Sequence, residues 1–126
     1  MDKSELQRRT KQFAVRVFKL VDALPQTPAG RAVANQLIRS ATSVGANYRG
    51  ACRARSRAEF AAKLGVALEE ADESLYWLEL IRDGELISPT KISLLLKEAN
   101  ELTAILASGR KSAKSNIKHR TSYIQK

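Results

Sequence analysis

Apolar residues recur every three or four positions in four long segments of the chain, and this spacing predicts four amphipathic helices. The expected helices cover about residues 3–24, 28–53, 57–82 and 89–109. The second segment carries an apolar stripe made of Val33, Leu37, Ala41, Val44 and Tyr48. Most apolar residues are Ala, Leu, Ile and Val, and Gly and Pro are few. This composition favours an all-α protein.

Capping signals mark the expected helix ends. Thr27 and Ser88 each stand before a proline, an arrangement typical of a helix start. Ser56 is followed three residues later by a glutamate, which predicts a capping box and a helix beginning after it. Gly84 is expected to end the third helix as a left-handed cap, and Gly109 is expected to end the fourth.

Four long helices joined by short turns predict an antiparallel, up-down-up-down four-helix bundle. The length of 126 residues suits one domain. We assign residues 1–109 to the bundle. Residues 110–126 are basic and polar, and we expect them to form a tail that is mobile in the free protein.

The chain is strongly basic, with a formal net charge of +9. Residues 1–109 contribute +3 of this charge, and residues 110–126, which contain no acid, contribute +6. An excess of this size indicates a polyanionic partner or an acidic membrane surface. The tail lacks an amphipathic apolar face, so the membrane alternative is the weaker one.

The bundle topology predicts where the cations lie. The first helix begins, the second turns into the third, and the fourth ends at the same end of the molecule. We call this end the basic pole, and we expect its cations to contact the backbone of RNA or DNA. Aromatic residues are sparse there, which disfavours base stacking and sequence preference. The cations of the basic pole are Arg8, Arg9, Lys11, Arg49, Arg53, Arg55, Arg57, Arg110, Lys111, Lys114, Lys118 and Arg120.

A second stripe on the second helix is small and polar, and it includes Ser40, Ser43 and Asn47. We interpret it as tight packing inside the bundle or between subunits, in preference to a polar binding groove. Arg39 is expected beside it, with acids of the third helix such as Glu73 forming a solvated face or pairing with arginines across a subunit interface.

The sequence gives little support to an enzyme. Di-iron bundles need Glu-x-x-His motifs on inward faces, and residues 1–109 contain no histidine. There is no glycine-rich phosphate loop, and Cys52 has no histidine partner nearby and is expected to be a packing residue. We therefore expect no catalytic residue, metal or cofactor. No leader or membrane span is recognisable, so we expect a cytoplasmic location.

Residues 37–60 carry a family resemblance through Leu37, Arg39-Ser40-Ala41, Ser43-Val44, Ala46-Asn47, Ser56 and Glu59-Phe60. In this pattern the chain resembles the four-helix-bundle proteins of intervening sequences in bacterial ribosomal RNA genes. The resemblance implies a homopentamer. It also implies similarity to accessory proteins of diversity-generating retroelements, which bind nucleic acid and a reverse transcriptase. The alternative function is a protein–protein interaction scaffold with no direct nucleic-acid role.

Overall fold

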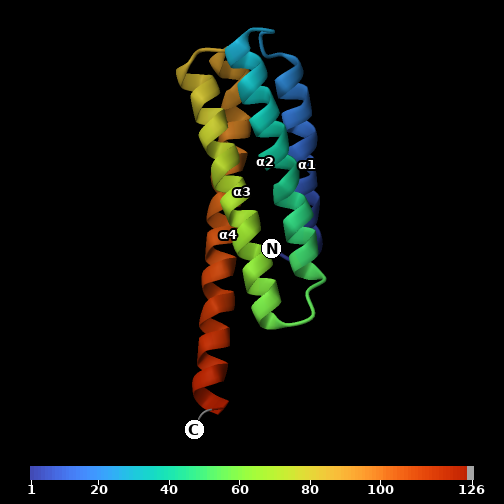
Figure 1. Ribbon diagram of the computed structural model, residues 1–126, viewed down its shortest axis with the longest axis vertical. Coiled ribbons are helices and arrows are strands. Elements are labelled where there is room, and N and C mark those ends of the chain that lie inside the picture. Colours follow the sequence, from blue (N-terminus) through green and yellow to red (C-terminus); the bar gives the residue numbers. More distant parts are fainter. Residues whose placement is uncertain (125–126) are drawn as a thin grey trace.

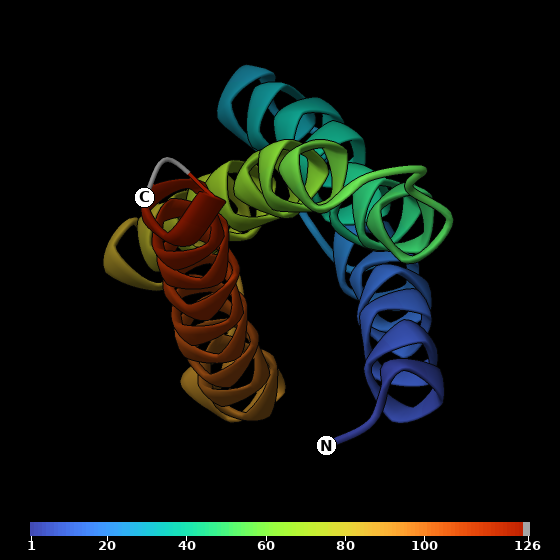
Figure 2. The same ribbon diagram turned by 90° about the horizontal axis from the view of Figure 1, so that it is seen from below.

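The computed structural model describes residues 1–124 of the chain, with side chains to residue 117. It consists of four helices: α1 (Lys3–Asp22), α2 (Pro28–Cys52), α3 (Arg57–Asp83) and α4 (Pro89–Ile124). Successive helices pack side by side in alternating directions (Figure 1), which confirms the predicted four-helix bundle. Seen along the bundle, the ribbons of α1 and α4 stand apart on one side (Figure 2), and these two helices touch one another less than the other neighbouring pairs do.

The core is built from the predicted apolar stripes. Val17, Leu37, Leu78 and Leu106, one from each helix, are all completely buried. Three polar side chains are buried among the described residues, namely Thr10, Ser40 and Ser74.

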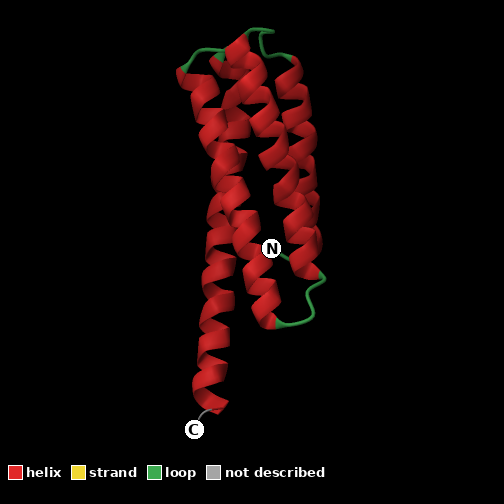
Figure 3. Ribbon diagram, in the orientation of Figure 1, coloured by secondary structure: helices red, strands yellow, loops and turns green. Residues whose placement is uncertain are grey.

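Helix starts follow the capping chemistry closely. The Thr27 hydroxyl accepts from the N–H of Gly30, and the Ser56 hydroxyl accepts from the N–H of Glu59. The Glu59 carboxylate accepts from the backbone N–H of Arg55, one residue before the position that a standard capping box uses. The three turns (Figure 3, green) are short, so the helix ends fix the turn positions.

The cap of α3 differs from the prediction. Gly84 has a right-handed φ of −82°, and Glu85 has the left-handed φ of 53° instead. The N–H of Leu86 donates to the carbonyl of Ile81, and the N–H of Glu85 donates to that of Arg82, which together make a Schellman motif. The glycine stands one residue too early for the left-handed position, so the motif forms with a glutamate there.

The end of α4 also differs from the prediction. Gly109 does not stop the helix, which continues to Ile124. A single glycine inside a helix costs only about 1 kcal/mol, and here the helix stays packed on α3: a Cβ at Gly109 would lie 3.4 Å from Leu64 Cδ2. Residues 110–124, predicted as a tail, therefore form a helical extension of the bundle (Figure 1). Lys126 lies outside the described residues.

Candidate nucleic-acid interface

The α2–α3 turn and the extension of α4 lie at the same end of the molecule (Figure 1). Arg57 and Phe60 at the start of α3 line a small cavity together with Ala113 and Asn116 of α4. The Lys3 ammonium lies 5.5 Å from the centre of the Phe60 ring, which brings the start of α1 to the same place. The start of α1, the arginine-rich turn and the extension are thus neighbours, as the topology predicts.

Most cations of the basic pole have no carboxylate partner. Within residues 1–117, no ion pair forms at eight of these cations, although thirteen acids are present in the chain. Positive charge that protein acids do not neutralise is available to phosphate. These eight cations are Lys11, Arg49, Arg53, Arg55, Arg57, Arg110, Lys111 and Lys114. The side chains of Lys118 and Arg120 lie outside the described ones.

Arg8 and Arg9 are used differently from the other cations. Arg8 forms an exposed ion pair of 2.7 Å with Glu5 on its own helix. Arg9 reaches across to α4, where its guanidinium donates to the carboxylates of Glu98 and Glu101. The hydrogen bond to Glu98 raises the pKa of Arg9, and the Arg9 side chain is only 18% exposed. Arg9 therefore joins α1 to α4, a role that the sequence did not reveal.

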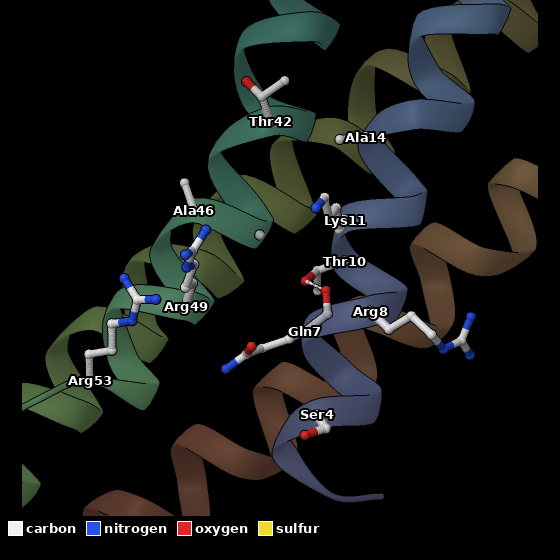
Figure 4. Close-up of a pocket in the computed structure, with 11 residues that line it drawn as sticks. Ser4, Gln7, Arg8, Thr10, Lys11, Ala14, Thr42, Ala46, Arg49 and Arg53 are labelled. Carbon is white, nitrogen blue, oxygen red and sulfur yellow. Dashed lines mark hydrogen bonds between the residues drawn. The ribbon is translucent and has the colours of Figure 1, made fainter.

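A wedge-shaped cleft opens between α1 and α2 at the basic pole. Its volume is about 620 Å³. Arg49 and Arg53 project from α2 beside it, facing Gln7 and Thr10 of α1 (Figure 4). The full lining is Ser4, Gln7, Arg8, Thr10, Lys11, Ala14, Thr42, Gly45, Ala46, Arg49 and Arg53, with no acid among them.

Arg110 lies where the extension leaves the bundle. Its side chain covers Gly65 of α3, where an added Cβ would lie only 2.8 Å from Arg110 Nε. This Nε is buried and has no hydrogen-bond partner. Arg110 also lines a shallow cavity of about 420 Å³ with Ala58, Ala62 and Lys114.

The polar stripe of α2 makes its contacts within the chain. Arg39 pairs with Glu73 at 2.6 Å and with Glu70 at 3.6 Å, both on α3. The Ser74 hydroxyl donates to that of Ser40 at 2.9 Å in the core. Ser43 and Asn47 donate to backbone carbonyls one turn earlier on α2. Arg39 therefore has carboxylate partners within its own chain, which agrees with packing inside the bundle.

Other candidate chemistry is sparse in the described part of the chain. Tyr48 is only 5% exposed, so it offers no ring face to a base, and burial raises its pKa. Cys52, its neighbour one turn away, is half-buried. Among the described residues, no three His, Cys, Asp or Glu side chains are grouped as a metal site would require, and no helix there is long and apolar enough to cross a membrane.

The fold and the unpaired cations together define a small, basic four-helix-bundle protein. Residues 2–108 match the family of 23S rRNA-intervening sequence proteins, and the chain belongs to this family. The resemblance read from residues 37–60 is thereby confirmed. The match ends just before Gly109, so the extension of α4 lies beyond it.

A solved structure supports this membership. A protein of unknown function from the S23 ribosomal protein family of Bacteroides thetaiotaomicron VPI-5482, solved at 1.70 Å, is 36% identical to the chain. The similarity covers 88% of this chain and 99% of that protein, with a TM-score of 0.80. No curated protein matches the sequence.

Proposed function

We propose that this protein is a non-enzymatic, homo-oligomeric accessory protein that binds the backbone of RNA or DNA through its basic pole. One observation carries the proposal: eight cations without acid partners gather at one end of the described chain. Phosphate is the abundant cellular anion that such a surface attracts, and arginine binds it through two parallel hydrogen bonds.

Binding of this kind should have little sequence preference. Backbone contacts position a protein on nucleic acid, whereas contacts to base edges or base faces read its sequence. Tyr48, which lies on α2 next to Arg49 of the cleft, is buried, so base stacking has little support. Affinity should instead fall steeply with salt, by a slope of about −0.9 per neutralised phosphate on duplex DNA.

Exposed apolar residues support the oligomer. On the outer face of α3, Val66 is 41% exposed, Tyr76 54% and Leu80 37%. Large apolar side chains that share one face often mark a protein interface. The family resemblance implies a pentamer, and five basic poles around one axis would reinforce one another. A reverse transcriptase is the partner that the same resemblance suggests.

The direct test is a filter-binding titration of the full chain with labelled RNA and DNA at low and moderate salt. We expect binding at low salt that weakens as salt rises. Removing residues 110–126 and replacing Arg55 and Arg57 with Gln should weaken it strongly and make its salt dependence shallower. The matched control replaces Lys19 and Lys91 with Gln, since both are exposed and lie at the other end of the bundle. No binding by the intact protein at low salt would refute the proposal.

The second candidate function is an interaction scaffold that binds another protein. The exposed outer face of α3 favours it, because the exposed acids Glu69 and Asp72 lie between Val66 and Tyr76 along the helix and give this face a chemistry unlike the basic pole. Light scattering distinguishes the parts of the proposal. A charge-depleted variant that keeps its assembled mass but loses nucleic acid supports the first function, whereas an assembled protein that never binds nucleic acid supports the scaffold.

A further inference from the structure

We propose that the cleft between α1 and α2 holds the sugar–phosphate backbone of a single nucleic-acid strand. This inference rests on the proposed function and assigns it a specific place. Four cations from two helices line the cleft. Lys11 on α1 lies on the side of Arg49 and Arg53 on α2, whereas the Arg8 side chain points away from α2 (Figure 4). Only Arg8 among them has an acid partner within residues 1–117.

The cleft owes its shape to close helix packing at one end. At Gly45 the backbone of α2 approaches α1 so closely that an added Cβ would lie 3.3 Å from Thr10 Oγ1 and 3.4 Å from the Thr10 carbonyl carbon. Beyond this contact the two helices diverge toward Ser4 and Arg53 (Figure 4). Ala14, Gly45 and Ala46 have little or no side chain, so the floor between the two basic rims stays open.

The polar groups of the cleft suit a phosphate. Thr10 and Thr42 satisfy their hydroxyls on backbone carbonyls of their own helices. The side chains of Ser4 and Gln7 have no hydrogen bond to residues 1–117 in the structure, so they can donate to phosphate or ribose oxygens. Lys11, Arg49 and Arg53 then supply charge, and Ser4 and Gln7 supply neutral donors on the α1 side of the cleft.

The volume of the cleft suits a single strand. The cleft holds about 620 Å³, and a DNA duplex is wider than its major groove, which alone is about 12 Å across. A duplex can therefore touch only the rims of the cleft. A single strand can enter it and engage both helices, with Arg49 and Arg53 about 6 Å apart along α2 at 1.5 Å per residue.

The test fills the cleft without changing the charge. Ala46 is exposed in the cleft, and Ala46→Phe would occupy it, while Ala32→Phe is the matched control at an exposed site near the other end of α2. Fluorescence anisotropy of the full chain is measured with labelled oligouridine and with a DNA duplex of equal length. Ala46→Phe should weaken oligouridine binding about tenfold, with duplex binding and the control unchanged.

Two further arms keep the test decisive. Wild-type protein cross-linked by light to oligouridine containing 4-thiouridine should give adducts in peptides from residues 4–14 and 42–53. Uridine monophosphate at equal concentration should not displace the strand, since a free nucleotide spans only part of the cleft. Light scattering checks that Ala46→Phe keeps the wild-type mass. If the mass changes, the cross-links to the wild-type protein test the cleft assignment instead.

Each outcome separates this inference from the function on which it rests. Adducts confined to residues 110–126 or to the α2–α3 turn would overturn the cleft assignment and leave backbone binding intact. The cleft assignment would also be overturned if strand and duplex bound equally well and Ala46→Phe changed neither affinity. Displacement of the strand by uridine monophosphate would overturn it too, because the cleft would then bind a free nucleotide. Absence of any binding at low salt would refute the proposed function itself.

Discussion

Glu85 adopts the left-handed conformation that the end of α3 requires, with a φ of 53°. A residue with a Cβ pays about 1–2 kcal/mol there, whereas glycine does not. Glu85→Gly should therefore raise the free energy of unfolding by about 0.5–1 kcal/mol, after allowing for the greater freedom of glycine in the unfolded chain. Urea denaturation measures the change.

Glu85→Ala is the control, because it removes the same carboxylate without relieving the backbone. It should give no gain. Equal stabilisation by both substitutions would mean that the charge, and not the conformation, is responsible.

Ser40 and Ser74 form the buried polar contact between α2 and α3, at 2.9 Å. Replacing either serine with Ala leaves the other hydroxyl with only its own helix as a partner. Each single variant should lose about 1 kcal/mol of unfolding free energy, and the double variant should lose less than the sum. A thermodynamic cycle of the four proteins by chemical denaturation checks this, and strict additivity would contradict it.

Contacts between specific side chains were the hardest feature to predict from the sequence. Ser56 and Glu59 lie close in the chain, and their cap was predicted within one residue. The pairing of Arg9 with Glu98 depends on how two helices are rotated and aligned, and residues 89 positions apart carry no local signal of it. The pairing of Arg39 with Glu70 and Glu73 is hidden from the sequence for the same reason.

At the scale of elements, the ion pair between Arg39 and Glu73 links α2 to α3. Hydrogen bonding to Arg39, with a smaller contribution from Trp77, lowers the pKa of Glu73 in the folded protein. A carboxylate whose folded pKa lies below its unfolded value stabilises the protein above the unfolded pKa, and this stability is lost as the pH falls through the folded pKa.

Arg39→Gln should therefore be less stable than the wild type at pH 7, and the difference should shrink below about pH 4.5. Melting temperatures across that range measure it. Glu5 and Glu59 also have lowered pKa values, because of hydrogen bonds from Arg8 and from the Arg55 backbone. Their contribution is present in the wild type and in Arg39→Gln alike, so it cancels in the comparison. A difference that persists unchanged into acid would show that Arg39 acts through packing instead.

The continuity of α4 through Gly109 leads to a second prediction at this scale. A Cβ there would make an ordinary contact of 3.4 Å with Leu64, so Gly109→Ala should strengthen the helix by up to about 1 kcal/mol. Hydrogen exchange of the amides in residues 110–124 should slow. Gly30→Ala is the contrasting variant, because its Cβ would lie 2.0 Å from the Pro25 carbonyl oxygen, and it should destabilise the protein.

The sequence predicted the four helices and their starts well, and the C-terminal ends of α3 and α4 less well. Long apolar stripes and N-terminal caps are local signals, so the starts of α2, α3 and α4 agree with the sequence. Gly109 has the local signature of a stop, yet packing against α3 outweighs the small cost of a glycine within a helix. The cleft could not be foreseen, because it arises from the divergence of two helices.

At the scale of the whole molecule, the exposed apolar face of α3 bears on assembly. If Val66 and Tyr76 lie in an interface between copies, Tyr76→Lys should reduce the mass measured by light scattering toward the 13.9 kDa of one chain. Leu94→Lys makes a comparable change on α4, where Leu94 is 70% exposed, and should leave the assembly intact. Disassembly by Leu94→Lys alone would move the interface to α4.

The uneven charge of the molecule determines how binding should depend on its parts. Residues 110–126 hold +6 of the net charge of +9, yet they lie beyond the residues that match the family. The shared bundle keeps the cleft and the arginine-rich turn, so a chain truncated after Gly109 should keep its preference for single strands. It should lose affinity and show a shallower salt slope.

The two ends of the bundle also differ as places to attach a reporter. The turns near Gln26 and Ser88 lie at the end remote from Arg55 (Figure 1). A purification handle fused after Lys126 would follow the basic residues 110–126 directly in the chain. An acidic epitope there would compete with phosphate for these cations, and a binding assay would then report an inactive protein. Dyes and surface tethers therefore belong at Gln26 or Ser88, where they leave the arginines open to solvent.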